Sequence, residues 1–172
     1  MKNLIHKIDL KVDIDKLKED CNYVLSQYDF NKHNQICFQN TTEDYDVYEG
    51  TGDARLSHCP MYGLKETDFK YFNPEFNNTI FKHIYDVFPF KIGRMRLAKL
   101  PAKKCYWMHT DPGMTRFHFA IHSNKDCLMV YRDYGAIHIP DDGFCYKMKT
   151  EEYHTAINAS KEDRIHLLIT GL

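Results

Sequence analysis

The segment Arg116-Phe117-His118-Phe119-Ala120-Ile121 alternates polar with apolar side chains, and Arg164-Ile165-His166-Leu167-Leu168-Ile169 largely repeats the pattern. Side chains two residues apart lie on one face of a β-strand. Each segment therefore predicts a strand with Arg and His on one face and hydrocarbon on the other. An ordinary solvated face would carry Lys and Glu, so this pattern favours polar faces that line a pocket. A polar side that simply faces solvent is the alternative.

Further strands are predicted from Gly93 onward, separated by turn residues such as Pro112-Gly113. In one of them His154 and Asn158 share a polar face. We therefore predict a barrel-like double sheet with a polar pocket inside one end. The additional strands are expected at residues 94–100, 128–131, 144–146 and 153–158.

The N-terminal half contains two predicted helices. Asp13 is a capping residue before an apolar stripe at helical spacing, and Asn73-Pro74 begins a second helix that Pro89 ends. Residues 31–65, between them, are rich in turn residues. We expect the helices to cover the outer apolar face of the sheet. The apolar positions are Ile14, Leu17, Cys21, Val24, Leu25 and Tyr28, then Phe76, Ile80, Ile84 and Val87.

Length and composition limit the class of protein. The 172 residues suffice for one domain, which we divide into a helical and loop-rich support region (1–92) and a β core (93–172). A net charge of -1 argues against nucleic acid as the main partner. None of the six cysteines forms a C-x-x-C pair, so zinc-ribbon and thioredoxin-type sites are not expected. We predict reduced thiols in a cytoplasmic protein with no membrane span.

A candidate metal site is formed by His109, Asp111 and His154. The pair His109-x-Asp111 follows an aromatic strand-like segment and precedes a turn, and His154 lies 45 residues later. Two imidazoles and one carboxylate hold a metal while leaving three positions open, an arrangement typical of non-haem iron oxygenases. The open positions suit a chelating cosubstrate and dioxygen.

Arginines near these ligands predict an anion site. Arg164 follows the third predicted ligand by ten residues, and Arg116 and His118 share one strand face after the first pair. A buried guanidinium requires an anionic partner and binds a carboxylate through two hydrogen bonds. A dicarboxylic acid fits this requirement, and a salt bridge to an acidic residue is the alternative. For Arg94 and Arg96 we predict the salt bridge, although either can reach the pocket.

These motifs resemble the aspartyl/asparaginyl β-hydroxylase family of iron(II)- and 2-oxoglutarate-dependent oxygenases, most clearly over residues 94–169. The resemblance implies a mainly β protein with N-terminal helices, built on a double-stranded β-helix (a cupin-like jelly-roll barrel). It implies iron binding by the two histidines of the candidate metal site. Arg164 would hold the C5 carboxylate of 2-oxoglutarate, and Arg116 and His118 the other carboxylate. The motifs are His109-Thr110-Asp111-Pro112, Arg116-x-His118, His154-x3-Asn158 and Arg164-x-His166.

The chain departs from its vertebrate relatives in one ligand. Those enzymes have glycine where this chain has Asp111, and they carry long accessory regions. The carboxylate strengthens the iron assignment, but it weakens the inference that this chain has the same substrate as those enzymes. Residues 34–39, 49–52 and 66–69 look like short members from phage or bacterial genomes, which implies a phage-encoded protein acting in the cytoplasm of a bacterial host.

The expected reaction is hydroxylation of a C–H bond with dioxygen, releasing succinate and CO2. Peptidyl Asp or Asn, an amino acid and a small metabolite remain open as substrates. Two alternatives remain: a cupin-like hydrolase or isomerase that uses zinc or manganese, and a non-enzymatic ligand-binding domain of the same fold. The hydrolase or isomerase would not explain Arg164 and Arg116, and the intact set of three ligands argues against the non-enzymatic domain.

Overall fold

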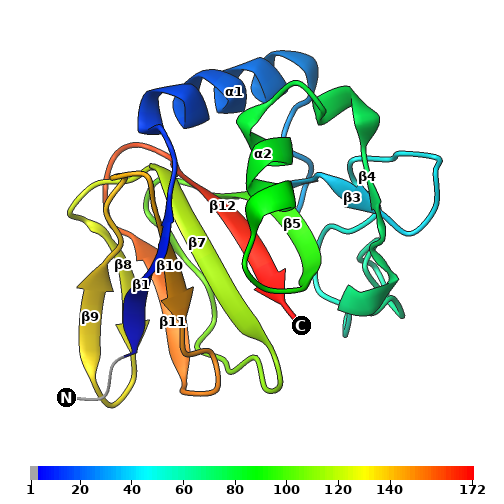
Figure 1. The fold of residues 1–172 in the computed structure, drawn as a ribbon. Coiled ribbons are helices and arrows are strands. Elements are labelled where there is room, and N and C mark those ends of the chain that lie inside the picture. Colours follow the sequence, from blue (N-terminus) through cyan, green and yellow to red (C-terminus); the bar gives the residue numbers. More distant parts are fainter. Residues whose placement is uncertain (1–3) are drawn as a thin grey trace.

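Two antiparallel sheets form the body of the computed structural model, which describes residues 4–172 (Figure 1). The larger sheet has six strands in the order β1-β10-β7-β12-β5-β2, and the smaller has four in the order β6-β11-β8-β9. The six strands are β1 (Ile5–Lys11), β10 (Phe144–Met148), β7 (Thr115–His122), β12 (Arg164–Gly171), β5 (Ile92–Leu100) and β2 (Gln35–Cys37). The four are β6 (Lys104–Cys105), β11 (His154–Asn158), β8 (Cys127–Tyr131) and β9 (Gly135–His138).

The order of the strands is that of a jelly roll. When β5 is counted as the first of eight strands, the sheets run 1-8-3-6 and 2-7-4-5, so the chain crosses between sheets at most connections. This is the double-sheet arrangement of two Greek keys. The predicted jelly roll is therefore confirmed. The two sheets do not pair with each other along their edges in residues 4–172, so the fold is an open sandwich and not a closed barrel.

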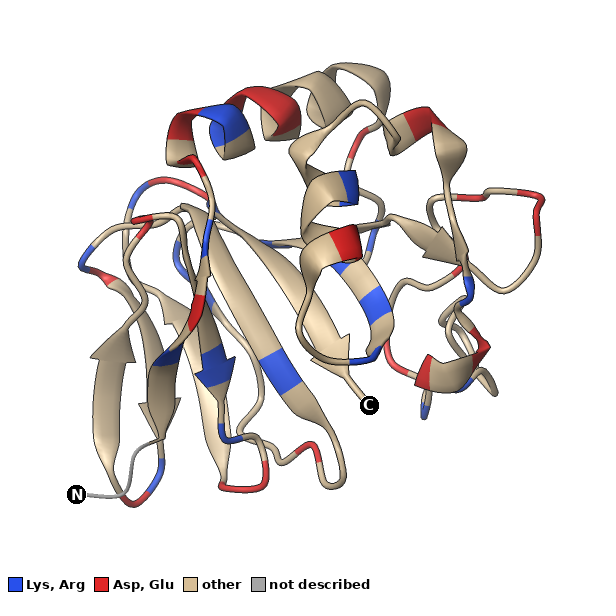
Figure 2. Ribbon diagram, viewed as in Figure 1, with Lys and Arg blue, Asp and Glu red and all other residues tan. Residues whose placement is uncertain are grey.

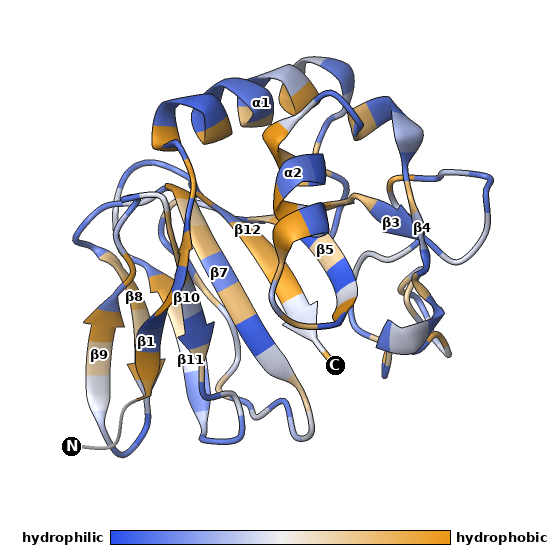
Figure 3. Cartoon of the chain, in the orientation of Figure 1, coloured by the Kyte–Doolittle hydropathy of each residue, from blue (hydrophilic) through white to orange (hydrophobic). Residues whose placement is uncertain are grey.

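The two faces of the larger sheet differ in chemistry, as the alternation predicted. Basic residues interrupt β5 and β7, whereas most acidic residues lie on helices and loops (Figure 2). The outer face is apolar and packs under α1 (Ile14–Gln27) and α2 (Ile80–Val87), and β12 and much of α2 carry hydrophobic residues (Figure 3). The main core therefore lies between the helices and this sheet. It includes Leu17, Cys21, Val24, Phe81, Ile84, Met95, Leu97, Phe117, Phe119, Ile165, Leu167 and Ile169.

The predicted first helix is confirmed, and the second is broken. The Asp13 side chain accepts hydrogen bonds from the backbone N–H groups of Asp15 and Lys16 at the start of α1. The segment after Asn73 forms a 3-10 turn, Pro74–Phe76, before α2 begins. Thr79 interrupts it with extended backbone (φ -111°, ψ 162°).

The interruption has a tertiary cause. Buried Asp20 of α1 accepts a hydrogen bond of 2.6 Å from the N–H of Ile80, which satisfies a donor at the start of α2. Val87, expected on the apolar face of the second helix, is instead 44% exposed.

The N-terminal region adds strands that the sequence analysis missed. β1 pairs with β10, and β2 pairs with β5, so both extend the larger sheet. Elsewhere residues 31–65 form mainly turns, as predicted, and β3 (Gln39–Asn40) pairs with β4 (Tyr71–Phe72). A 3-10 turn at Glu66–Asp68 lies against β5. No helix within residues 4–172 combines the length and the hydrophobicity that a membrane crossing requires.

Candidate metal centre and anion pocket

A cavity of about 910 Å³ lies between the two sheets and is also walled by residues 52–67. The inner polar faces of β7 and β12 line it, so the pocket reading of the strand pattern is confirmed over a solvent-facing side. All six residues predicted for the site border this one cavity: His109, Asp111, Arg116, His118, His154 and Arg164.

The three candidate metal ligands converge at this cavity. One ligand atom from each of His109, Asp111 and His154 lies within 4.8 Å of the others. The backbones of His109 and His154 exchange two hydrogen bonds of 2.9 Å, which brings together residues 45 positions apart. The N–H of Asp111 donates to the Thr150 carbonyl at 2.8 Å and anchors the third residue of the group.

The rings of the two histidines are each held by a backbone carbonyl through Nδ1. Nδ1 of His109 lies 2.7 Å from the Trp107 carbonyl oxygen, and Nδ1 of His154 lies 2.9 Å from that of Glu152. A carbonyl oxygen only accepts, so each Nδ1 carries a proton and Nε2 is the ring atom that is available to a metal. Burial also lowers the pKa of His154, which favours the neutral ring.

Asp111 is kept ionised by its neighbours. Nε of Arg116 donates to Asp111 Oδ2 at 3.1 Å. Burial by itself would raise the pKa of the Asp111 carboxyl, but the charge and hydrogen bond of Arg116, with His109 and His154, lower it below the ordinary value. The carboxylate is therefore available as a ligand at neutral pH.

Arg116 is in turn held by a buried carboxylate, Glu66. Glu66 accepts hydrogen bonds from Nη1 of Arg116 at 3.2 Å and from Nη2 of Arg94 at 2.9 Å. Burial would raise the pKa of Glu66, but Arg94, with Arg96 and Arg116, lowers it to about 2. The salt bridge predicted for Arg94 is confirmed.

Two buried arginines have no such partner. Arg164 is 4% exposed, and its one side-chain hydrogen bond within residues 4–172 is donated by Nη1 to the Met129 sulfur at 3.7 Å. Arg96 is also 4% exposed. No carboxylate in residues 4–172 lies within salt-bridge distance of either, so the salt bridge predicted for Arg96 is wrong. Both guanidiniums border the cavity.

Two neutral histidines lie beside these arginines. The Nδ1 atoms of His118 and His166 are 3.2 Å apart, so one ring donates a hydrogen bond to the other. Burial, followed by the charge of Arg164, lowers both pKa values well below 6.5. The rings therefore add hydrogen-bonding groups to the cavity without adding charge.

Other residues differ from their expected place. Asn158, expected on the polar face of His154, does not border the cavity; it donates to the carbonyls of Leu100 and Glu162 and accepts from Ser160, and so orders the turn before β12. Glu66 was missed because it lies in a loop-rich stretch 28 residues before Arg94. Arg96 had a signal in the alternation of β5, which places it on the same face as Arg94.

Comparison with protein families gives one match. The sequence model described as aspartyl/asparaginyl beta-hydroxylase matches residues 59–171. A search of curated proteins found no match.

Solved structures show the same fold at low identity. The viral collagen prolyl hydroxylase vCPH from Paramecium Bursaria Chlorella virus-1, in its 2OG complex, is 12% identical with a TM-score of 0.55, over 99% of this chain and 97% of that one. The non-heme monooxygenase ThoJ, in a nickel complex, is 11% identical with a TM-score of 0.52, over 96% and 72% of the two chains. Because the family model covers most of the chain, the protein belongs to the aspartyl/asparaginyl β-hydroxylase family.

Proposed function

We propose that this protein is an iron(II)- and 2-oxoglutarate-dependent oxygenase that hydroxylates a C–H bond of a peptide or small-molecule substrate. The observation that carries the proposal is a convergent His-Asp-His group in a cavity that also holds the unpaired guanidinium of Arg164. Family membership as a hydroxylase supports the same reaction class.

The donor set fits iron(II). Two imidazole nitrogens and one carboxylate oxygen are borderline and hard donors that suit divalent iron and leave positions for other ligands. The carbonyls of Trp107 and Glu152 fix both rings, and Arg116 occupies one oxygen of Asp111 so that the other is free. Such supporting contacts orient metal ligands and tune their basicity.

The cavity also fits a dicarboxylic cosubstrate. A buried guanidinium without a carboxylate partner is costly, and a bound dicarboxylate would relieve that cost at Arg164. His118 and His166 are neutral and can donate to or accept from the same ligand. When bound, iron and 2-oxoglutarate supply the oxidation of a C–H bond by dioxygen, with release of succinate and CO2.

The protein itself positions the cosubstrate and Asp111 and excludes water. Arg164 enters from β12 and is 4% exposed, so the cosubstrate carboxylate that it binds is shielded from solvent. Arg116 keeps Asp111 in place through a hydrogen bond on the cavity side. We also propose a cytoplasmic location, since five of six cysteines are buried as free thiols, which suits a reducing compartment.

The proposal is tested by binding and by turnover. Anaerobic addition of iron(II) and then 2-oxoglutarate should produce the weak visible charge-transfer band of a chelated 2-oxo acid, and aerobic incubation should convert 2-oxoglutarate to succinate. Arg164→Gln should weaken 2-oxoglutarate binding by about 100-fold or more, the value of losing a charge-assisted bidentate contact.

A zinc- or manganese-dependent hydrolase or isomerase would show no such band and no succinate. Arg164→Gln would also leave the activity of such an enzyme unchanged. Metal binding without any 2-oxoglutarate binding would therefore exclude the proposed oxygenase.

A further inference from the structure

Arg96 is a buried cation that the proposed metal and cosubstrate sites leave unexplained. It lies on β5 with its side chain at the cavity, and its Nε and Nη1 atoms are buried without a hydrogen-bond partner in the described chain. Arg94, two residues earlier on the same face, is fully paired with Glu66. An unpaired buried guanidinium costs stability, which indicates a ligand absent from the chain itself.

The charge around the cavity points to the sign of that ligand. The inner faces of β5, β7 and β12 present four arginines, and two carboxylates contact them, which leaves +2 (4 − 2). A divalent metal and the 2-oxoglutarate dianion bring equal and opposite charge, so the excess remains after both bind. The groups counted are Arg94, Arg96, Arg116, Arg164, Glu66 and Asp111. Burial lowers the pKa of Arg96 only to about 9, so it stays charged at neutral pH.

Arg96 and Arg164 enter the cavity at different places. In the register of the sheet Arg96 is opposite Leu168 of β12, four residues from Arg164, so their backbones are roughly 13 Å apart along the strand. The Arg164 guanidinium lies beside Met129 of β8, whereas Arg96 is opposite Cys37 of β2.

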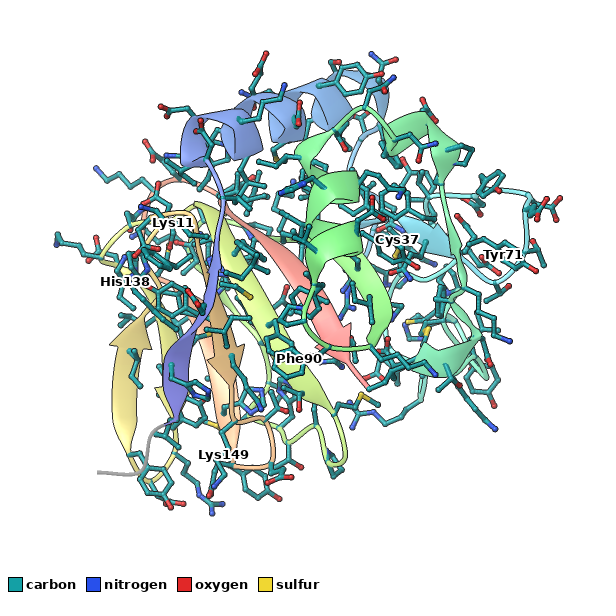
Figure 4. All side chains as sticks on the ribbon, in the orientation of Figure 1. Lys11, Cys37, Tyr71, Phe90, His138 and Lys149 are labelled. Carbon is teal, nitrogen blue, oxygen red and sulfur yellow. The ribbon has the colours of Figure 1, made fainter. Side chains whose placement is uncertain are left out.

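Figure 4 labels one residue from each of these two regions of the sheets. Cys37 lies toward one side of the molecule, and His138, on the strand that pairs with β8, lies toward the other. A cosubstrate held by Arg164 therefore leaves Arg96 available for a second anion.

We propose that Arg96 binds an anionic group, a carboxylate or a phosphate, on the primary substrate, and that the protein accepts an acid in preference to its neutral amide. The inference rests on the proposed function for the ligand of Arg164. The planar fork of arginine matches either anion through charge-assisted hydrogen bonds. An amide of the same shape leaves the charge uncompensated, so it binds less tightly.

Thermal unfolding of the metal-free protein separates a ligand-binding arginine from a structural one. Arg96→Met should leave the Tm unchanged or raise it, because it removes an unpaired buried charge. Arg94→Met is the matched control, and it should lower the Tm by at least about 6 °C, because it leaves Glu66 without its main partner. A comparable loss in both variants would make Arg96 structural and overturn the proposal.

Calorimetric titration tests the ligand. Protein saturated with manganese(II) and 2-oxoglutarate would be titrated with N-acetyl-L-aspartate amide, its asparagine counterpart and inorganic phosphate. We expect one of the two anions to bind, and the asparagine compound to bind at least 10-fold more weakly than the aspartate one. Arg96→Gln should weaken anion binding at least 10-fold and change the 2-oxoglutarate affinity less than 2-fold, whereas Arg164→Gln should weaken 2-oxoglutarate binding.

The outcomes distinguish this inference from the proposed function. If metal and 2-oxoglutarate bind but neither anion does, or if Arg96→Gln weakens 2-oxoglutarate instead, the inference fails and the oxygenase proposal stands. The anion titrations are repeated without metal or cosubstrate. If the protein binds no metal but does bind an anion, and Arg96→Gln loses that binding, the anion site is supported and the oxygenase proposal is rejected.

Discussion

Replacement of Glu66 by Gln should destabilise the protein strongly at neutral pH. The Glu66 side chain is 6% exposed, donors from Arg94 and Arg116 surround it, and the N–H of Arg94 also bonds to it at 3.0 Å. Its pKa falls from an ordinary 4.5 to about 2 on folding. That difference corresponds to about 3 kcal/mol of stability. Loss of one partner of a buried ion pair costs a similar 3–5 kcal/mol in general.

The contribution of Glu66 to stability should depend on pH in a defined direction. Because folding lowers the pKa of Glu66, its contribution is complete above about pH 5 and is lost as pH falls through the folded value near 2. The difference in stability between wild type and Glu66→Gln should therefore shrink from about 3 kcal/mol at pH 7 to about 1 kcal/mol at pH 3.

Urea unfolding of the metal-free protein at both pH values measures this difference. Glu43→Gln, at an exposed position, is the control and should change stability by less than about 0.5 kcal/mol. A Glu66→Gln difference below about 1 kcal/mol at pH 7, or one that does not depend on pH, would refute the reasoning from the charge network.

Three further changes test the site and the fold. His154→Ala should abolish quenching by iron(II) of the fluorescence of Trp107, the only tryptophan, which neighbours the site; unaltered quenching would exclude His154 as a ligand. Asp13→Ala should cost about 1 kcal/mol in urea unfolding through loss of the helix cap, and an unchanged midpoint would contradict that role. Gly143→Ala should cost at least about 2 kcal/mol, because φ is +78° and an added Cβ would lie 2.3 Å from the Val12 carbonyl oxygen; a Tm within 2 °C of wild type would show that the turn adapts.

Most regular elements of this protein follow from local pattern. The period-two alternation at 116–121 and 164–169 predicted strands with a polar inner face, because successive side chains of a strand point to opposite sides. The capping Asp13 and the stripe behind it predicted α1, because both depend only on neighbours within one or two turns. The motifs also indicated which histidines and arginines to examine.

Pairing between distant segments could not be predicted from local pattern. The strand Ile5–Lys11 has a clear partner only in β10, and the break before Ile80 depends on Asp20 of another helix. Neither the strand nor the helix break is indicated clearly by the residues that are its neighbours in the sequence.

The charges in the cavity show the same difference between what the sequence predicts and what the tertiary structure decides. Sequence placed Arg94 and Arg96 on one strand face and predicted a salt bridge for each. Tertiary structure brings Glu66 to Arg94 and Arg116 but leaves Arg96 without a carboxylate partner in the described chain. Alternation determines which way a side chain points, because it is a property of the backbone. Whether that side chain meets an opposite charge depends on how separate segments pack, and only the folded chain decides it.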